Sequence, residues 1–122
     1  MTQDSLLFRQ VNPNFVREGR ITSQVFKPTP KDGKLLSVYD GELITAQNSY
    51  MHYTVRLGFS SLGVVAVTPA ECGKLDLRVN SDPIPFPEHA VIDFRGYSNN
   101  QITSKAKYLK DAAVTRGWEY TR

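Results

Sequence analysis

The chain has 122 residues, a single cysteine and a formal net charge of +3. This length fits one domain with one hydrophobic core, and 22% charged residues is ordinary for a folded protein. The lone Cys72 excludes an internal disulfide and any centre built from several thiolates, so we expect a cytoplasmic protein. No apolar run reaches the ~18 residues that a membrane span needs.

The first part of the chain is predicted to form strands. Residues 5–11 have a strand-like pattern, end at the turn-forming Asn12-Pro13-Asn14, and place Arg9 among apolar neighbours. Arg9 there most simply faces solvent. Two more strands are predicted over residues 21–26 and 35–39, on either side of a loop with two prolines and a glycine. We interpret these two strands as a hairpin-like unit.

Polar side chains cluster on this unit. Thr22, Ser23 and Gln24 are adjacent in mid-strand, and alternation places Ser23 on one face and the other two on the opposite face. We expect these polar side chains to decorate a solvent face or to line a binding pocket. Buried without partners, each would cost about 1–3 kcal/mol. Lys31 and Asp32 in the loop either keep the loop soluble or contact a partner. We predict that these five residues form a recognition surface.

A helix is predicted over residues 46–57, with Thr45 as its cap. At 100° per residue, its core-facing stripe runs from Ala46 to Leu57 through two tyrosines. His52 and Arg56 lie four residues apart on a neighbouring flank, where they meet either one anion or water.

The middle of the chain contains its most apolar strand, residues 63–67, which we place centrally in the sheet. The sequence Thr68-Pro69-Ala70-Glu71 then predicts a short helix, with a capping threonine, a proline at the first position and a glutamate that closes the capping box. A short strand is predicted over residues 75–79.

A proline-rich segment precedes the next strand. Residues 82–89 carry proline at every second position, which predicts an extended segment that cannot be a central strand. Ile84 and Phe86 either cover the core from this segment or contact a partner. Residues 90–94 are predicted as a second central strand, and His89 at its entry is either a structural residue or a general base.

The clearest predicted helix covers residues 98–116. The last 18 residues hold five bases and two acids, which accounts for the whole net charge of +3. An anionic partner such as a nucleic acid would therefore approach this end. However, the basic side chains do not form one ridge on the helix. The bases predicted to meet a nucleic acid are Lys105, Lys107, Lys110 and Arg116.

Four residues are candidates for catalysis: Arg9, Tyr39, His52 and His89. For each, a structural role is the alternative. No glycine-rich phosphate loop, dinucleotide fingerprint, nucleophile elbow or paired-histidine spacing occurs, so we expect neither a cofactor nor a metal.

Several blocks resemble small uncharacterised bacterial proteins: FRQV at 8–11, TSQVFKPTPKD at 22–32, LSVYDG at 36–41 and PFPEHAVIDF at 85–94. This resemblance implies a bacterial or phage-borne cytosolic protein and no catalytic residues. Separately, the early Leu-Phe-Arg strand and a tyrosine on a later strand resemble parts of the RES-type, NAD-consuming toxin domain. The chain departs from that domain in length and lacks a recognisable acidic partner.

The sequence predicts a single α+β domain, with a twisted, mainly antiparallel sheet covered on one face by two helices. The leading functional hypothesis is a binding or accessory module in a multi-protein bacterial system of the defence or toxin–antitoxin type, with a protein as partner. The alternative is a small enzyme acting on a nucleotide or nucleic acid. The two differ in geometry, because an enzyme requires the candidate side chains to meet around one pocket.

Overall fold

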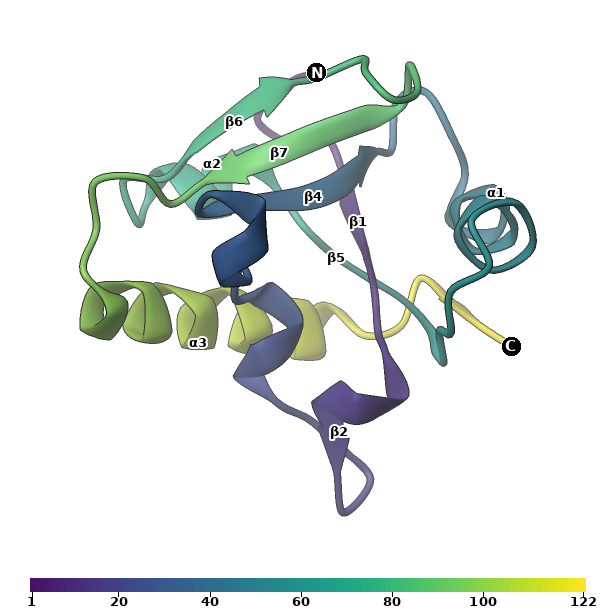
Figure 1. Cartoon of the computed structure of the whole chain (residues 1–122), viewed down its shortest axis with the longest axis horizontal. Coiled ribbons are helices and arrows are strands. Elements are labelled where there is room, and N and C mark those ends of the chain that lie inside the picture. Colours follow the sequence, from purple (N-terminus) through teal and green to yellow (C-terminus); the bar gives the residue numbers. More distant parts are fainter.

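The computed structural model describes residues 1–122 and confirms the α+β class. A six-stranded antiparallel sheet has the order β6-β7-β4-β1-β5-β8, and β2 and β3 form a separate hairpin (Figure 1). The strands are β1 (Leu7–Gln10), β2 (Val16–Arg17), β3 (Arg20–Ile21), β4 (Leu35–Asp40), β5 (Gly63–Val67), β6 (Arg78–Ser81), β7 (His89–Asp93) and β8 (Tyr120–Thr121). The α-helices are α1 (Ala46–Met51), α2 (Pro69–Gly73) and α3 (Asn99–Arg116).

The two predicted helices pack on opposite faces of the sheet, not on the same face. Alternate residues of β5 belong to different hydrophobic clusters: Val65 and Val67 to the larger one, Val64 and Ala66 to the smaller one. The larger cluster includes the apolar stripe of α3, whereas Tyr50 of α1 packs against the smaller one. Because β5 is buried on both faces, each face needs its own cover.

The prediction of a strand over residues 21–26 is wrong. Only Ile21 belongs to a strand, and Ser23–Phe26 forms a 3-10 helix between α3 and the sheet. Val25 and Phe26 are fully buried in the larger cluster, so this segment fills the core instead of extending the sheet. A second 3-10 turn, Pro30–Asp32, follows before β4. The hairpin-like unit therefore does not exist.

The predicted helix over 46–57 forms, with one change. Thr45 caps α1 as expected, by accepting a hydrogen bond from Asn48. After Met51 the helix widens into a π-helical turn, His52–Arg56, in which Leu57 N donates to His52 O at 3.0 Å. This wider turn carries Leu57 out of the expected core stripe, and Leu57 is exposed.

The remaining elements follow the sequence closely. Thr68 caps α2 and Ser98 caps α3, each through a complete capping box. β5 lies one strand in from the β8 edge, and the strand predicted at 75–79 starts later, at Arg78. None of the helices is both long enough and apolar enough to cross a membrane.

Candidate functional site

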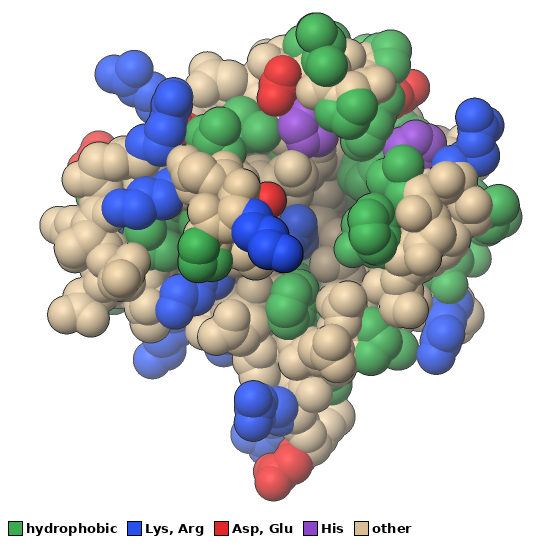
Figure 2. Space-filling model, in the orientation of Figure 1, with side chains coloured by type: hydrophobic (Ala, Val, Ile, Leu, Met, Phe, Trp, Pro, Cys, Tyr) green, Lys and Arg blue, Asp and Glu red, His purple; other side chains and the backbone are tan.

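A cavity of about 410 Å³ opens where β1 and β4 diverge. The two strands pair only at Leu7–Asp40 and Phe8–Tyr39, after which β1 turns away from β4 (Figure 1). Side chains of both strands, of the proline-rich segment before β7 and of the π-helical turn line the cavity. Figure 2 shows a hollow on this face, with hydrophobic side chains around it and the histidines beside it.

Arg9 lies at the point of divergence. Its Nε donates to the carbonyl of Val25 at 2.7 Å, and its Nη1 donates to the carbonyl of Ser37 at 3.0 Å. No carboxylate lies within ion-pairing distance of its guanidinium. Burial lowers the pKa of Arg9 from its ordinary value, although Tyr53 and Asp32 partly oppose this shift. The cavity thus contains a desolvated positive charge whose only bonded partners are neutral carbonyls.

Tyr39 and His52 meet at one wall of the cavity. The phenol oxygen of Tyr39 lies 2.8 Å from Nδ1 of His52, and Phe86 stacks on the Tyr39 ring at 5.2 Å between centroids. Burial raises the pKa of Tyr39, and electrostatic interactions with Tyr53 and Glu88 raise it further. Tyr39 is therefore a neutral hydroxyl and not a phenolate at physiological pH.

His89 joins β7 to the exposed Ser37 of β4. Its Nδ1 lies 2.9 Å from the backbone carbonyl of Asp82 and 3.5 Å from the carboxylate of the same residue. A carbonyl only accepts hydrogen bonds, so Nδ1 must carry the proton. Nε2 of His89 then accepts the hydroxyl proton of Ser37, with 2.9 Å between the two atoms. Serine, histidine and Asp82 thus form a connected chain at the cavity wall.

The floor of the cavity is held by a buried polar network. Nε2 of Gln10 donates to Oγ of Ser49 at 3.2 Å, and Oγ of Ser61 donates to Oε1 of Gln10 at 2.9 Å. No buried side-chain nitrogen or oxygen in the chain lacks a partner. These contacts tie β1 to α1 and to the segment before β5, and so fix the wall that carries Arg9.

The structure brings the four catalytic candidates together. Arg9, Tyr39 and His89 line the cavity, and His52 contacts it through Tyr39. They come from four separate elements, so no local sequence motif could have predicted that they form one site. The sequence alone did not single out Ser37 as a candidate. Its position two residues before Tyr39, on the same face of the predicted strand, is the pattern that could have indicated it.

The five residues of the predicted recognition surface do not stay together. The hydroxyl of Thr22 donates to the carbonyl of Phe15 at 2.7 Å, so it is an internal contact. Gln24 borders a different groove, of about 810 Å³, beside the start of α3. Ser23 begins the 3-10 helix, and Lys31 is exposed on the next turn. Only Asp32 lines the cavity.

Most of the basic side chains predicted to meet a nucleic acid form hydrogen bonds or ion pairs with other residues of the chain. Lys105 donates to the carbonyl of Leu75 at 2.5 Å, and Lys110 pairs with Asp111 at 2.6 Å. Arg116 forms a two-pronged ion pair with Glu71, described below. Lys107 alone is exposed and makes no ion pair.

The site is therefore a partly apolar cavity with an arginine, a neutral phenol and a serine–histidine pair. No group of three or more His, Cys, Asp or Glu side chains is placed to hold a metal ion. Comparisons of the chain with protein-family models, with curated proteins and with solved structures found no match.

Proposed function

We propose that the cavity binds a small ligand with an anionic group and a planar ring, and that a nucleotide is the class that fits best. The protein would then be a small enzyme acting on such a ligand. The observation that carries this proposal is the desolvated guanidinium of Arg9, which lacks a carboxylate partner and stands in a cavity with aromatic walls.

Charge supports the anionic part of the ligand. Removing a charge from water is unfavourable unless an opposite charge compensates it, and the nearby Asp32 compensates Arg9 only in part, because the pKa of Arg9 is still lowered. Groups with a pKa perturbed in this way are concentrated at functional sites. Arginine also has donors to spare: five N–H groups, of which two are used by the carbonyls of Val25 and Ser37. The rest can bind a phosphate or carboxylate in the two-pronged geometry that a guanidinium favours.

The aromatic walls support the planar part. Phe86 and Tyr39 stack at an interplanar angle of 26°, and Tyr53 and Phe59 pack 5.1 Å apart between centroids. A base stacked on such rings gains about 1–3 kcal/mol in proteins that bind single-stranded nucleic acids. An aromatic cavity with a few convergent polar groups is also the usual form of a small-molecule site.

Calorimetric titration tests this proposal. The purified chain is titrated with adenosine and uridine monophosphates, and in parallel with the two nucleosides. We expect a monophosphate to bind at least about ten times more tightly than its nucleoside, since a charged hydrogen bond contributes about 1.5–3 kcal/mol. Equal affinity for nucleoside and nucleotide, or no binding of either, would contradict it.

A second candidate function is that of a protein-binding module, and one observation supports it. Four large apolar side chains are exposed within the nine residues that begin at the last residue of α1: Met51, Val55, Leu57 and Phe59, with Val55 66% exposed. Exposed apolar groups of this kind mark surfaces that meet another protein. This surface supports the protein-binding part of the proposal. The cytoplasmic accessory role in a bacterial defence or toxin–antitoxin system is retained from the sequence alone.

Affinity copurification tests the binding module. Tagged wild-type chain and a Val55→Glu variant are expressed in the organism that encodes the protein, and Lys107→Glu on α3 serves as a control for an added acid. A reproducible protein retained by the wild type and the control, and lost with Val55→Glu, is the expected result. Identical recovery with all three chains would exclude this surface as the docking site.

A further inference from the structure

We infer that Ser37 is a nucleophile and that His89 is its general base. The inference rests on the proposed function, because it specifies what the cavity does to a bound phosphoester. It is carried by one geometry: a serine hydroxyl, 2.9 Å from an imidazole nitrogen that can only accept, at the wall of a cavity that also contains an arginine.

The histidine is held in the orientation and tautomer that a base needs. The carbonyl of Asp82 accepts the proton of Nδ1 at 2.9 Å, and this leaves the lone pair of Nε2 directed at Ser37. The carboxylate of Asp82, 3.5 Å from Nδ1, adds a negative charge that stabilises His89 once it is protonated. A nucleophile, a base and a group that orients the base form the arrangement expected of an activated serine.

The serine is accessible, and an anion bound to Arg9 would lie beside it. Ser37 is an exposed residue of β4 and lines the cavity. Nη1 of Arg9 is 3.0 Å from the carbonyl oxygen of this same serine. A phosphate held by the remaining donors of the guanidinium would lie in the same cavity that Ser37 lines. The positive charge of Arg9 also stabilises the negative charge that develops on the phosphate oxygens during transfer.

The proposed reaction is transfer of a phosphoryl group from a phosphoester to Ser37, followed by hydrolysis. Oγ forms a bond to phosphorus as its proton passes to Nε2 of His89. The bond from phosphorus to the leaving oxygen breaks, and that oxygen keeps the electron pair and takes the proton from His89. Water, deprotonated by His89, then attacks phosphorus and displaces Oγ, which takes that proton back from His89. One water is consumed for each phosphoester bond broken.

A fluorophosphonate probe tests the inference, because its phosphorus reacts with an activated serine and releases fluoride. We expect the wild-type chain to gain one adduct, located at Ser37 by peptide mass spectrometry. Ser37→Ala should abolish labelling, and Ser60→Ala, which changes an exposed serine outside the cavity, should leave it unchanged. His89→Gln should slow labelling by about 100-fold or more, the usual contribution of a general base.

A milder variant separates catalysis from folding. Asp82→Asn keeps the backbone carbonyl and removes only the carboxylate, so Asp82 is tested as a positioning residue. We expect its labelling rate to fall less than that of His89→Gln, with an unchanged circular dichroism spectrum. Labelling of Asp82→Asn and His89→Gln at the wild-type rate would overturn the role of His89 as base.

The outcomes distinguish this inference from the proposed function. Nucleotide binding without any adduct at Ser37 would overturn the nucleophile and leave the ligand class standing. An adduct at Ser37 in a chain that binds no nucleotide would support the nucleophile and overturn the ligand class. If both are right, a bound monophosphate should slow labelling of the wild-type chain.

Discussion

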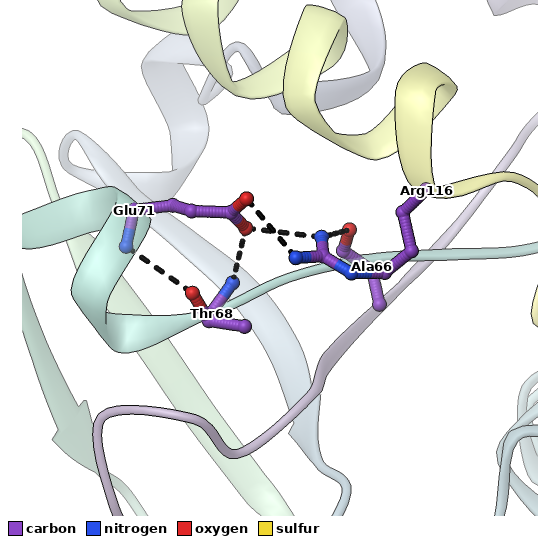
Figure 3. A network of polar contacts seen from close by, with 4 residues as sticks. All are labelled: Ala66, Thr68, Glu71 and Arg116. Carbon is purple, nitrogen blue, oxygen red and sulfur yellow. Dashed lines mark hydrogen bonds and ion pairs between the residues drawn. The ribbon is translucent and has the colours of Figure 1, made fainter.

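Two arginines of this chain bond to the sheet in similar ways but differ in what neutralises them. Nη1 of Arg116, at the end of α3, donates to the carbonyl of Ala66 in β5 at 2.8 Å, as Nη1 of Arg9 does to the carbonyl of Ser37. Arg116 also makes two 3.0 Å bonds to the carboxylate of Glu71, one from each terminal nitrogen (Figure 3). Arg9 has no such partner.

The Arg116 site is a closed network. Oε1 of Glu71 also accepts from the backbone N–H of Thr68 at 2.9 Å, within the capping box of α2 (Figure 3). Burial of Glu71 opposes its ionisation, but the hydrogen bonds from Arg116 and Thr68 outweigh burial, and the pKa of Glu71 is lowered. The charges of Arg116 and Glu71 neutralise each other. This ion pair joins α2, α3 and β5, and it leaves no net charge to bind a ligand.

The comparison shows how one residue type serves structure in one place and recognition in another. A guanidinium with a carboxylate is a structural clamp, whereas a guanidinium with carbonyls alone keeps its charge available. The predictions below test this difference, beginning with the largest expected effect.

Removal of the Arg9 charge should affect ligand binding most. We expect Arg9→Gln to weaken binding of a nucleoside monophosphate by roughly 10- to 150-fold, because a charged hydrogen bond contributes about 1.5–3 kcal/mol. Calorimetry measures the change. Arg56→Gln makes the same change of charge at an exposed residue outside the cavity and should have little effect. Equal losses in both variants would mean that Arg9 is not the anion contact.

Removal of the Glu71 charge should affect stability and not binding. We expect Glu71→Gln to lower the free energy of unfolding by about 1–2 kcal/mol, since Gln still caps α2 but bonds Arg116 less strongly. Urea unfolding measures this loss. Glu119→Gln, at a glutamate without an ion pair, is the control. A weaker nucleotide affinity in Glu71→Gln with unchanged stability would reverse the assignment of roles.

The contribution of Glu71 should depend on pH. Its pKa is lowered in the folded chain, so its stabilisation is complete above the unfolded value of about 4.3 and is lost as the pH falls through the folded value. The difference in unfolding free energy between wild type and Glu71→Gln should therefore shrink over the pH range below about 4.3. A difference that stays constant over that range would show that the carboxylate is not the source.

The Tyr39–His52 contact should contribute a smaller amount. We expect Tyr39→Phe to cost about 1 kcal/mol, because Nδ1 of His52 loses its partner in a partly buried setting. Thermal and urea unfolding report this cost. Tyr108→Phe removes a phenol that is on the surface, and it should change stability by no more than a few tenths of a kcal/mol. The same cost in both variants would argue against a structural role for the contact.

The smallest effect is expected at Lys107. Since the other three bases of the predicted nucleic-acid face are held internally, Lys107→Ala should remove at most about one phosphate contact. Heparin chromatography over a salt gradient measures it. Strong retention that falls sharply in this variant would instead show that α3 does bind nucleic acid.

Local patterns in the sequence predicted the elements that depend on local chemistry. Caps at Thr45 and Thr68 form as expected, because a cap needs only a side chain and the backbone three residues ahead. The continuous apolar run of β5 also predicted burial on both faces correctly. By contrast, the strand predicted over residues 21–26 does not form. Val25 and Phe26 are buried in the core through tertiary contacts, and a local sequence pattern does not show such contacts.

The sequence by itself determined the α+β class, most element positions and the identity of the polar candidates. Only the tertiary structure decided that Arg9, Ser37, Tyr39 and His89 share one cavity, and that the two helices cover opposite faces of the sheet. The physical reason is range: caps and periodicity act over three or four residues, whereas Ser37 and His89 are brought together by strand pairing across 52 positions of chain.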